Sequence, residues 1–362
     1  MIQRDATKIN IPALTGLRTI AAYFVFLYHY APSEAVIGRF IYGIFRELHI
    51  GVTIFFVLSG FLITIRYYAT TKISLPWLIG YFKNRFARIY PVFFCTMAAT
   101  LIVQGNQHPI SCLLNLTMTG GFLNNNYLAI PQAWSLTVEE CFYMSAPFIF
   151  FIARKSKGLI LSLVTVYLIG AVLIGLGLNE PGYFENISQA MLRTYFGRGF
   201  EFFCGIYLGL FVLKNNNSKV LSRSGVAIFT YLGVAGIFIV TVLLSMIAAK
   251  INNTALSHPV GIFLNNFILP PCIAVLIYGL VSERTSLGKF LSLRIMVFLG
   301  KSSYTFYLLH VGILSGILLK YTPINNIELF VLINLISMAI YVVFEEPMQK
   351  FIKNMKLKFI TN

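Results

Sequence analysis

The sequence predicts an all-α polytopic membrane protein of about ten transmembrane helices, with both termini in the cytoplasm. Of the 362 residues, 57% are hydrophobic and only 11% are charged, whereas a soluble domain is about 45–50% apolar and about 25% charged. The apolar residues form long continuous runs, which favour membrane helices over the alternating pattern of barrel strands. A third observation is that the basic residues sort to one side of these runs.

A bilayer core about 30 Å thick requires roughly 20 apolar residues of helix for each crossing. Ten candidate segments result: 11–31, 48–66, 89–104, 139–153, 158–178, 199–213, 225–249, 260–281, 303–319 and 327–344. The first contains Arg18 and lacks a small-residue cleavage site, so it is interpreted as a retained span and not as a signal peptide. We expect residues 1–362 to form a single membrane domain with no additional soluble domain.

The formal net charge of +16 would suggest nucleic-acid binding in a soluble protein. With a cytoplasmic N-terminus and ten spans, however, 22 of the 28 Lys and Arg residues fall in cytoplasmic segments and 6 outside. This distribution follows the positive-inside rule, so the charge indicates orientation, and no nucleic-acid partner is expected. The five cysteines form no CxxC pair, so neither a disulfide framework nor a metal site is predicted.

Arg18 and His29 are the polar exceptions in the first predicted span. Eleven residues of helix return to within roughly 20° of the same face, about 16 Å further along the axis. Ionisable groups inside spans usually face a cavity or a partner, which makes this stripe a functional candidate. The alternative is a structural histidine at the outer headgroup level.

The second predicted span contains the Ser59-Gly60 step, which we interpret as close helix packing because no base is visible near Ser59. A cytoplasmic loop then ends in Arg85 and Arg88 before Pro91. Arginines three apart share one side of a helical turn and could clamp a phosphate, or could serve only as an orientation signal.

The segment after the external loop contains Trp134 and the adjacent acids Glu139 and Glu140. Neighbouring helical residues point about 100° apart, so only one carboxylate can easily face a central lumen. Glu139 is the functional candidate, against the alternative that the acids mark a polar helix start. His310 lies within an apolar span, where taken alone it indicates a structural hydrogen bond.

These pieces, in this order, resemble the acyltransferase-3 family of integral membrane O-acyltransferases, which includes bacterial O-antigen and peptidoglycan O-acetylases. The matching stretches are Leu14–Arg18 followed by His29, Phe55–Ile63, Arg85–Pro91, Trp134–Leu136 with Glu139, and Ser303-Tyr304 with Tyr307 and His310. The resemblance covers nearly the whole chain. One departure is Thr15, where the family commonly has Asp. Some relatives carry a further C-terminal esterase-like domain, which we do not expect in this chain.

The resemblance implies a multi-pass protein of the cell membrane that takes an acyl group, most commonly acetyl, from cytoplasmic acyl-CoA to a sugar or glycan hydroxyl at the outer side. Acyl-CoA is then a donor substrate, and no permanently bound cofactor is expected. His29 would be the catalytic centre, as a general base or as the carrier of an acyl-imidazole. Glu139 would support the imidazole, Arg18 would line the donor path, and Arg85 and Arg88 would hold the CoA phosphates. Trp134 and His310 are the candidates for substrate binding.

Two other function classes fit the same buried polar residues. A transporter or flippase for a lipid-linked glycan or a small metabolite is one, although transporters often show internal repeats and none is detected here. A purely structural membrane protein is the other, and it leaves Arg18 and His29 on one face without an explanation. The oligomeric state and the acceptor sugar are not predicted.

Overall fold

The computed structural model describes residues 11–105, 108–122, 128–178, 180, 183, 186–215 and 227–355. Every regular element in these ranges is a helix, as predicted. The predicted cytoplasmic position of both termini falls on residues 1–10 and 356–362, which lie outside the described residues.

A helix lies at each of the ten predicted segments. The long helices are α1 (Pro12–His29), α4 (Ile50–Tyr67), α5 (Leu75–Val103), α7 (Ala133–Ile152), α8 (Gly158–Gly177), α10 (Tyr195–Asn215), α11 (Ile228–Ile251), α13 (Leu269–Ser282), α15 (Arg294–Leu309) and α17 (Asn326–Ile340). Short α-helices connect or extend them: α2 (Glu34–Ile37), α3 (Arg39–Phe45), α6 (Pro109–Leu116), α9 (Ile187–Arg193), α12 (Pro259–Phe263), α14 (Ser286–Leu291), α16 (Ile313–Tyr321) and α18 (Glu346–Asn354). Single 3-10 turns are η2 (Tyr68–Thr70), η3 (Gly120–Phe122) and η5 (Ala255–Ser257), and two π-helical turns, η6 (Leu264–Ile268) and η7 (Tyr341–Glu345), join α12 to α13 and α17 to α18.

Eight helical stretches of the described chain are long and apolar enough to cross a membrane, and a bent pair raises the number to nine. This supports a multi-pass integral membrane protein. The helix α1 has 18 residues but is not among the eight. Its own arginine and terminal histidine reduce its apolar character, so the count of ten stays a prediction.

Two predicted helix starts differ clearly from the structure. The helix α5 begins at Leu75 and not near residue 89, which places Arg85 and Arg88 inside a helix and not at the end of a loop. The helix α7 begins at Ala133, so Glu139 is already in its second turn. The predicted segments followed the apolar runs, whereas both helices begin earlier, in stretches that contain polar residues.

The predicted span 303–319 is wrong as a single helix. The helices α15 and α16 are bent by 76° at a break between Leu309 and Ile313. Gly312 in this break has φ +130°, a conformation that L side chains rarely adopt. The break was missed because the residues on both sides of it are equally apolar.

The helices α4 and α10 pack closely through glycine, as the Ser59-Gly60 step predicts. A Cβ at Gly60 would lie 2.3 Å from the carbonyl oxygen of Phe202, and one at Gly205 would lie 2.1 Å from that of Val57. Small residues at such contacts bring helix backbones together in membranes, where dispersion forces drive association. Ser59 has a further contact, described below.

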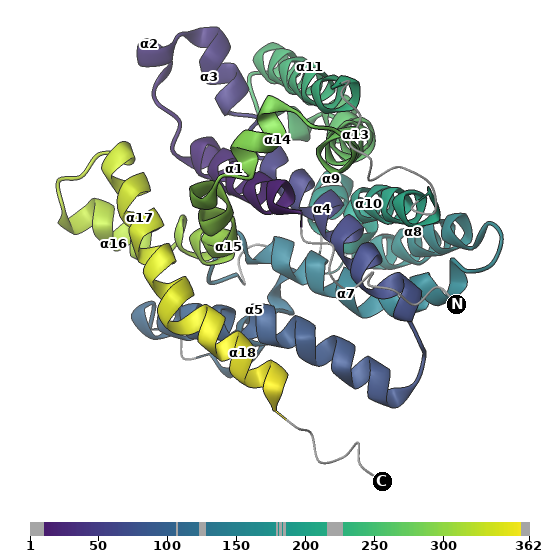
Figure 1. The fold of residues 1–362 in the computed structure, drawn as a ribbon. Coiled ribbons are helices and arrows are strands. Elements are labelled where there is room, and N and C mark those ends of the chain that lie inside the picture. Colours follow the sequence, from purple (N-terminus) through teal and green to yellow (C-terminus); the bar gives the residue numbers. More distant parts are fainter. Residues whose placement is uncertain are drawn as a thin grey trace.

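The helices α1 and α15 lie side by side near the middle of the molecule, with α4 next to α1 and α17 next to α15 (Figure 1). Arg18 contacts Ser303 near one end of the pair, and the ring of His29 lies beside that of His310 at the other. Contacts therefore advance in the same direction along both chains, so the two helices are parallel. This register brings the first and the last sequence motifs together.

Candidate active site

Arg18 and Glu139 line one small cavity of about 40 Å³ between α1, α4, α7 and α15. The Nε of Arg18 donates a hydrogen bond to Ser303 Oγ at 3.4 Å, and its guanidinium lies 5.6 Å from the centre of the Phe55 ring. A cation over an aromatic face is stabilised by the ring quadrupole. The arginine predicted inside the first span is therefore held in a fixed place.

The Glu139 carboxylate is the acceptor of two hydroxyl groups. Ser59 Oγ donates to Glu139 Oε1 at 2.6 Å, and the Tyr143 hydroxyl donates to the same oxygen. Of the two adjacent acids, only Glu139 is among the residues that line the cavity. Since it is the seventh residue of α7, a role at the first turn of the helix does not describe it.

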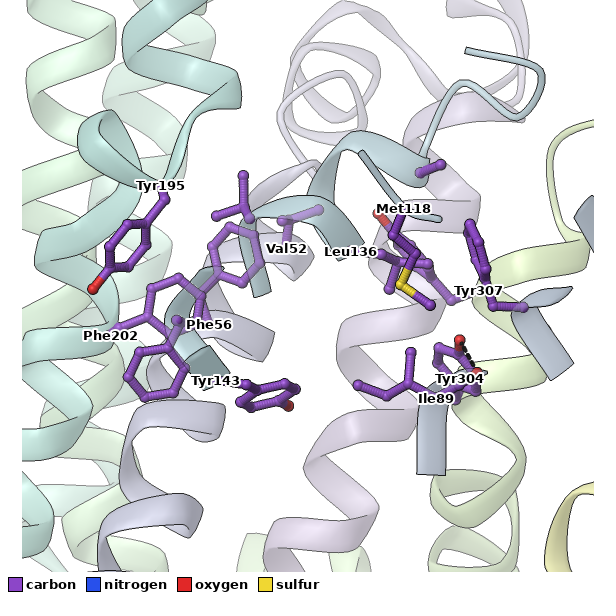
Figure 2. Close-up of a cluster of buried hydrophobic side chains, with 14 of the residues drawn as sticks. Val52, Phe56, Ile89, Met118, Leu136, Tyr143, Tyr195, Phe202, Tyr304 and Tyr307 are labelled. Atoms are coloured by element: carbon purple, nitrogen blue, oxygen red, sulfur yellow. Dashed lines mark hydrogen bonds between the residues drawn. The ribbon is translucent and has the colours of Figure 1, made fainter. Parts of the chain in front are cut away.

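Aromatic and apolar side chains surround this polar pair. Figure 2 shows Phe56 against Phe202, whose ring centres are 4.7 Å apart, and Tyr304 with its hydroxyl bonded to the Ile89 carbonyl at 2.8 Å. Leu136 and Tyr307 belong to the same buried cluster and also line the cavity. Such walls exclude water and strengthen the electrostatic interactions between the groups inside.

His29 and His310 form a second polar group at the other end of α1 and α15. Their ring centres are 5.3 Å apart. His29 is exposed, whereas His310 is 0% exposed and its Nδ1 lies 2.7 Å from the Tyr307 carbonyl oxygen. The Tyr30 hydroxyl also donates to the His310 carbonyl at 2.9 Å.

The structure does not place Glu139 beside His29. The described partners of the Glu139 carboxylate are Ser59 and Tyr143, and those of the His29 ring are Tyr28 and His310. Arg18 and His29, predicted to share one face of α1, thus belong to two separate polar groups. The helical rise sets these two residues about 16 Å apart.

Trp134 lies in a buried cluster that the sequence analysis missed. Its ring is 5.9 Å from the Arg198 guanidinium, which forms an ion pair with Glu201 at 2.9 Å. Arg198 also donates to Thr53 Oγ1 at 3.1 Å and to Asn266 Oδ1 at 3.4 Å. An Arg and a Glu three apart within an apolar run were the available signal, since such pairs face each other on a helix. Arg198 was assigned to an outside segment from the sequence, so its pairing with Glu201 was not recognised.

Arg85 and Arg88 differ in their surroundings. Arg85 is 7% exposed, and its guanidinium lies 5.3 Å from the Tyr67 ring centre and 5.5 Å from that of Tyr143. Its Nη2 donates to the Tyr67 hydroxyl at 3.3 Å. Arg88 is partly exposed. Tyr143 contacts both Arg85 and Glu139. Arg85 therefore belongs to the wall of side chains between the inner cavity and the start of α5.

A larger cavity of about 440 Å³ opens near this wall, where the end of α4, the first turns of α5 and the end of α18 meet. Its lining includes two cations, Arg66 and Lys353, and two aromatic rings, Trp77 and Tyr81. The two rings stack with an interplanar angle of 12° and centres 5.4 Å apart. Neither Arg66 nor Lys353 was singled out from the sequence, because both looked like ordinary flanking charges.

Comparisons with known proteins agree with the motifs. The chain is 26% identical over 374 residues to "Putative O-acetyltransferase SACOL0978" of Staphylococcus aureus strain COL, covering 95% of this chain and 56% of that protein. It is 28% identical over 336 residues to "O-acetyltransferase OatA" of Staphylococcus aureus strain NCTC 8325, covering 84% of this chain and 50% of that protein. The chain thus spans about half the length of the curated relatives it matches.

No solved structure matches the chain. The acyltransferase domain family, acyltransferase-3, matches residues 11–346, which is nearly the whole chain. These residues include both polar groups of α1 and their partners on α7 and α15. The chain, whose described part holds several helices long and apolar enough to cross a membrane, therefore belongs to the acyltransferase-3 family.

Proposed function

We propose that this protein, located in the cell membrane, transfers an acyl group from cytoplasmic acyl-CoA to a hydroxyl of a sugar or glycan at the outer side, with His29 as the catalytic centre. The observation that carries the proposal is the placement of two polar groups along α1. Arg18 lies at a small inner cavity, and His29 lies exposed at the far end of the same helix. The printed names of the relatives, O-acetyltransferases, favour acetyl as the acyl group.

The cavity with Arg66 and Lys353 is the proposed entry for the donor. Coenzyme A carries several phosphate charges and cannot cross hydrocarbon, so it must bind from water at a site with cations. Arg88, partly exposed on α5, adds a further cation near this entry. Arg85, which is buried against Tyr67 and Tyr143, would act from the cavity wall and not as a surface clamp.

Arg18 and Glu139 would control the passage between the two sides. The polar thioester end of the donor needs hydrogen-bonding groups where lipid would otherwise surround it. The 40 Å³ cavity is the candidate for that passage, and the Arg18 guanidinium would donate hydrogen bonds to the thioester carbonyl there. Glu139 would thus support the chemistry through Arg18, Ser59 and Tyr143. Trp134, partly exposed at the start of α7, offers an aromatic face to the acceptor.

His29 would move the proton in the transfer. The acceptor oxygen attacks the thioester carbonyl carbon, a C–O bond forms and the C–S bond breaks. The neutral imidazole can take the hydroxyl proton and give it to the departing thiolate. In the alternative route, a His29 ring nitrogen attacks first and carries the acyl group until the hydroxyl replaces it. Both routes use the same ring.

Release of free thiol from acetyl-CoA by the purified protein tests this function. We expect thiol release that increases with a glycan acceptor and falls to background in His29→Ala. The matched control is His258→Asn, since His258 accepts a hydrogen bond from Val260 N at the start of α12 and Asn can do the same. Full activity of a well-folded His29→Ala protein would reject the assignment. Transport of a glycan without thiol release would indicate the transporter alternative.

Mass spectrometry without acceptor separates the two routes. An acyl group retained on the peptide that carries His29 would identify the acyl-imidazole route. Thiol release that requires the acceptor, with no acylated peptide, would identify general-base catalysis.

A further inference from the structure

His310 is held rigidly at the break between α15 and α16. Its side chain is fully buried, and its ring lies parallel to that of Phe306, with an interplanar angle of 7° and centres 6.2 Å apart. The Tyr30 hydroxyl donates to its carbonyl oxygen, which α15 no longer uses because the helix ends at Leu309. A histidine that served only to fill space would not need these constraints.

The hydrogen bond to Tyr307 determines which ring nitrogen of His310 carries the proton. A carbonyl oxygen can only accept, so Nδ1, at 2.7 Å from it, must be the donor. Gln132 Nε2 donates to the same carbonyl at 3.3 Å, and also to the Leu308 and Val311 carbonyls at 3.0 and 2.7 Å. Gln132 thereby holds in place the backbone that orients the ring.

Nε2 of a neutral His310 is then an unprotonated acceptor in a buried position. Within the part of the chain that the structure describes, this atom has no hydrogen-bond partner. Buried polar atoms are nearly always paired, so an unpaired one is a candidate for a functional contact. Its polar neighbour is the ring of His29.

The spacing of the two rings suits one hydrogen bond. With centres 5.3 Å apart, two facing ring nitrogens come to about 3 Å, which is a hydrogen-bond distance. Since His29 is exposed, its ring can rotate toward His310, whereas the buried His310 ring cannot turn away.

We propose that His310 is a positioning residue for His29: its Nε2 accepts the N–H of one His29 nitrogen, so that the other nitrogen faces the acceptor hydroxyl without a proton. This inference rests on the proposed function of His29. When His29 takes the hydroxyl proton, the bond to His310 stabilises the charge that develops on the imidazole, and no proton needs to pass to His310. The role differs from substrate binding, because a fully buried ring does not meet the acceptor directly.

Two substitutions separate this role from a structural one. In His310→Asn, the amide nitrogen can keep the bond to the Tyr307 carbonyl, but Nε2 is lost. In His310→Gln, the longer side chain can place its amide oxygen near the position of Nε2. Positioning of His29 predicts that His310→Asn lowers kcat by about 10- to 100-fold with little change in acceptor KM, and that His310→Gln recovers much of it. If His310 has only a structural role, His310→Asn should keep more activity than His310→Gln, in proportion to the fraction of each protein that is folded.

Chemical modification of His29 provides a readout that does not depend on turnover. Diethylpyrocarbonate reacts with unprotonated imidazole nitrogens, and mass spectrometry measures the rate for each histidine peptide. We expect slower modification of His29 in His310→Asn, near-normal modification in His310→Gln, and an unchanged rate at His258. Equal His29 rates and equal kcat in wild type and His310→Asn would overturn the inference.

The activities of the variants distinguish a failure of the positioning role of His310 from a failure of the proposed function. If His29→Ala keeps full activity, the proposed function fails. If His29→Ala is inactive but His310→Asn is as active as wild type, only the positioning role fails. If both hold, adding His310→Asn to His29→Ala should cause no further loss, because the two residues act as one unit.

Discussion

Ser59 and Glu139 are joined by a hydrogen bond of 2.6 Å between α4 and α7. The sequence predicts helix packing for the Ser59-Gly60 step, and the family resemblance implies that Glu139 supports the imidazole of His29. In the structure the hydroxyl of Ser59 donates to the carboxylate, and the Tyr143 hydroxyl donates to the same oxygen. Ser59 therefore holds the Glu139 carboxylate, whereas its neighbour Gly60 packs against α10.

Glu139→Gln should lower kcat by about 10- to 100-fold while leaving the fold intact. Glutamine keeps the size of the side chain but removes the negative charge that faces the Arg18 cavity, where low polarity makes charge effective. Ser59→Ala should cause a smaller loss, because Tyr143 still donates to the carboxylate. Thiol release from acetyl-CoA, normalised to folded protein, measures both.

Glu140→Gln is the matched control for this prediction. Glu140 is the next residue on α7 and is not among those that line the cavity. Equal losses in the two glutamine variants would show that negative charge anywhere on this turn is sufficient, and that Glu139 has no specific role.

The ten helical segments followed from the sequence because membrane helices must satisfy their backbone internally and present apolar side chains to lipid. The parts that could not be predicted depend on contacts between distant segments. The spacing of Arg198 and Glu201 is visible in the sequence, but the contacts of Arg198 with Thr53 and Asn266 depend on how distant segments pack. Likewise, nothing local marks His310 as the neighbour of His29, since their adjacency comes from the parallel packing of α1 and α15.

The break at residues 310–312 shows a second limit of sequence reasoning. The Val311 carbonyl accepts from Gln132, just before α7, and the His310 carbonyl accepts from Tyr30, just after α1, so the local sequence carries no capping signal. Arg85 shows the same limit in a different way. Its pair with Arg88 had the spacing of a phosphate clamp, but the tyrosines that bury it come from α4 and α7.

Arg66→Ala and Lys353→Ala should each raise the KM for acetyl-CoA by about five- to tenfold with little change in kcat. Both cations line the 440 Å³ cavity, and each would contribute one charge-assisted contact to a phosphate. Because part of the site is open to water, raising the ionic strength should weaken donor binding in the wild type and do so less in the double variant. Steady-state thiol release at several salt concentrations measures this.

Lys320→Ala is the control for charge removal in general. Lys320 is exposed at the end of α16 and lies 5.2 Å from the Tyr321 ring centre. It should change neither the KM nor its salt dependence. A donor KM that is unaffected by Arg66→Ala and Lys353→Ala together would remove this cavity from the donor path.

Gly205→Ala should destabilise the protein by about 1–3 kcal/mol through overpacking between α10 and α4. The new methyl group would lie 2.1 Å from the Val57 carbonyl oxygen and 2.7 Å from the Phe61 nitrogen, both backbone atoms of α4. Thermal unfolding in detergent measures the change. Gly175→Ala, on an exposed face of α8 with nothing within 4 Å of the added carbon, should be neutral or slightly stabilising because Ala is the better helix former.

Glu283 should make the stability of the protein fall at acidic pH. Its carboxylate follows α13 and accepts hydrogen bonds from Phe229 N at 2.8 Å and from Thr230 N and Oγ1 at 2.8 and 2.7 Å, which caps the start of α11. Burial raises the pKa of Glu283, but the hydrogen bonds from Thr230 and Phe229 together outweigh it and lower the pKa below the ordinary value of 4.5. A carboxyl group with a lowered pKa in the folded state stabilises the protein fully above its unfolded pKa and loses this contribution as the pH falls through its folded pKa.

Wild type should therefore lose part of its thermal stability below pH about 4.5, the ordinary pKa of a Glu side chain, and Glu283→Gln should lose less over the same range. At neutral pH the same substitution should cost about 1–3 kcal/mol, because the amide replaces a charged acceptor of three hydrogen bonds. Unfolding curves from about pH 3 to about pH 7, compared between the two proteins, measure this difference. Parallel curves with a constant offset would show that the ionisation of Glu283 does not contribute to the cap.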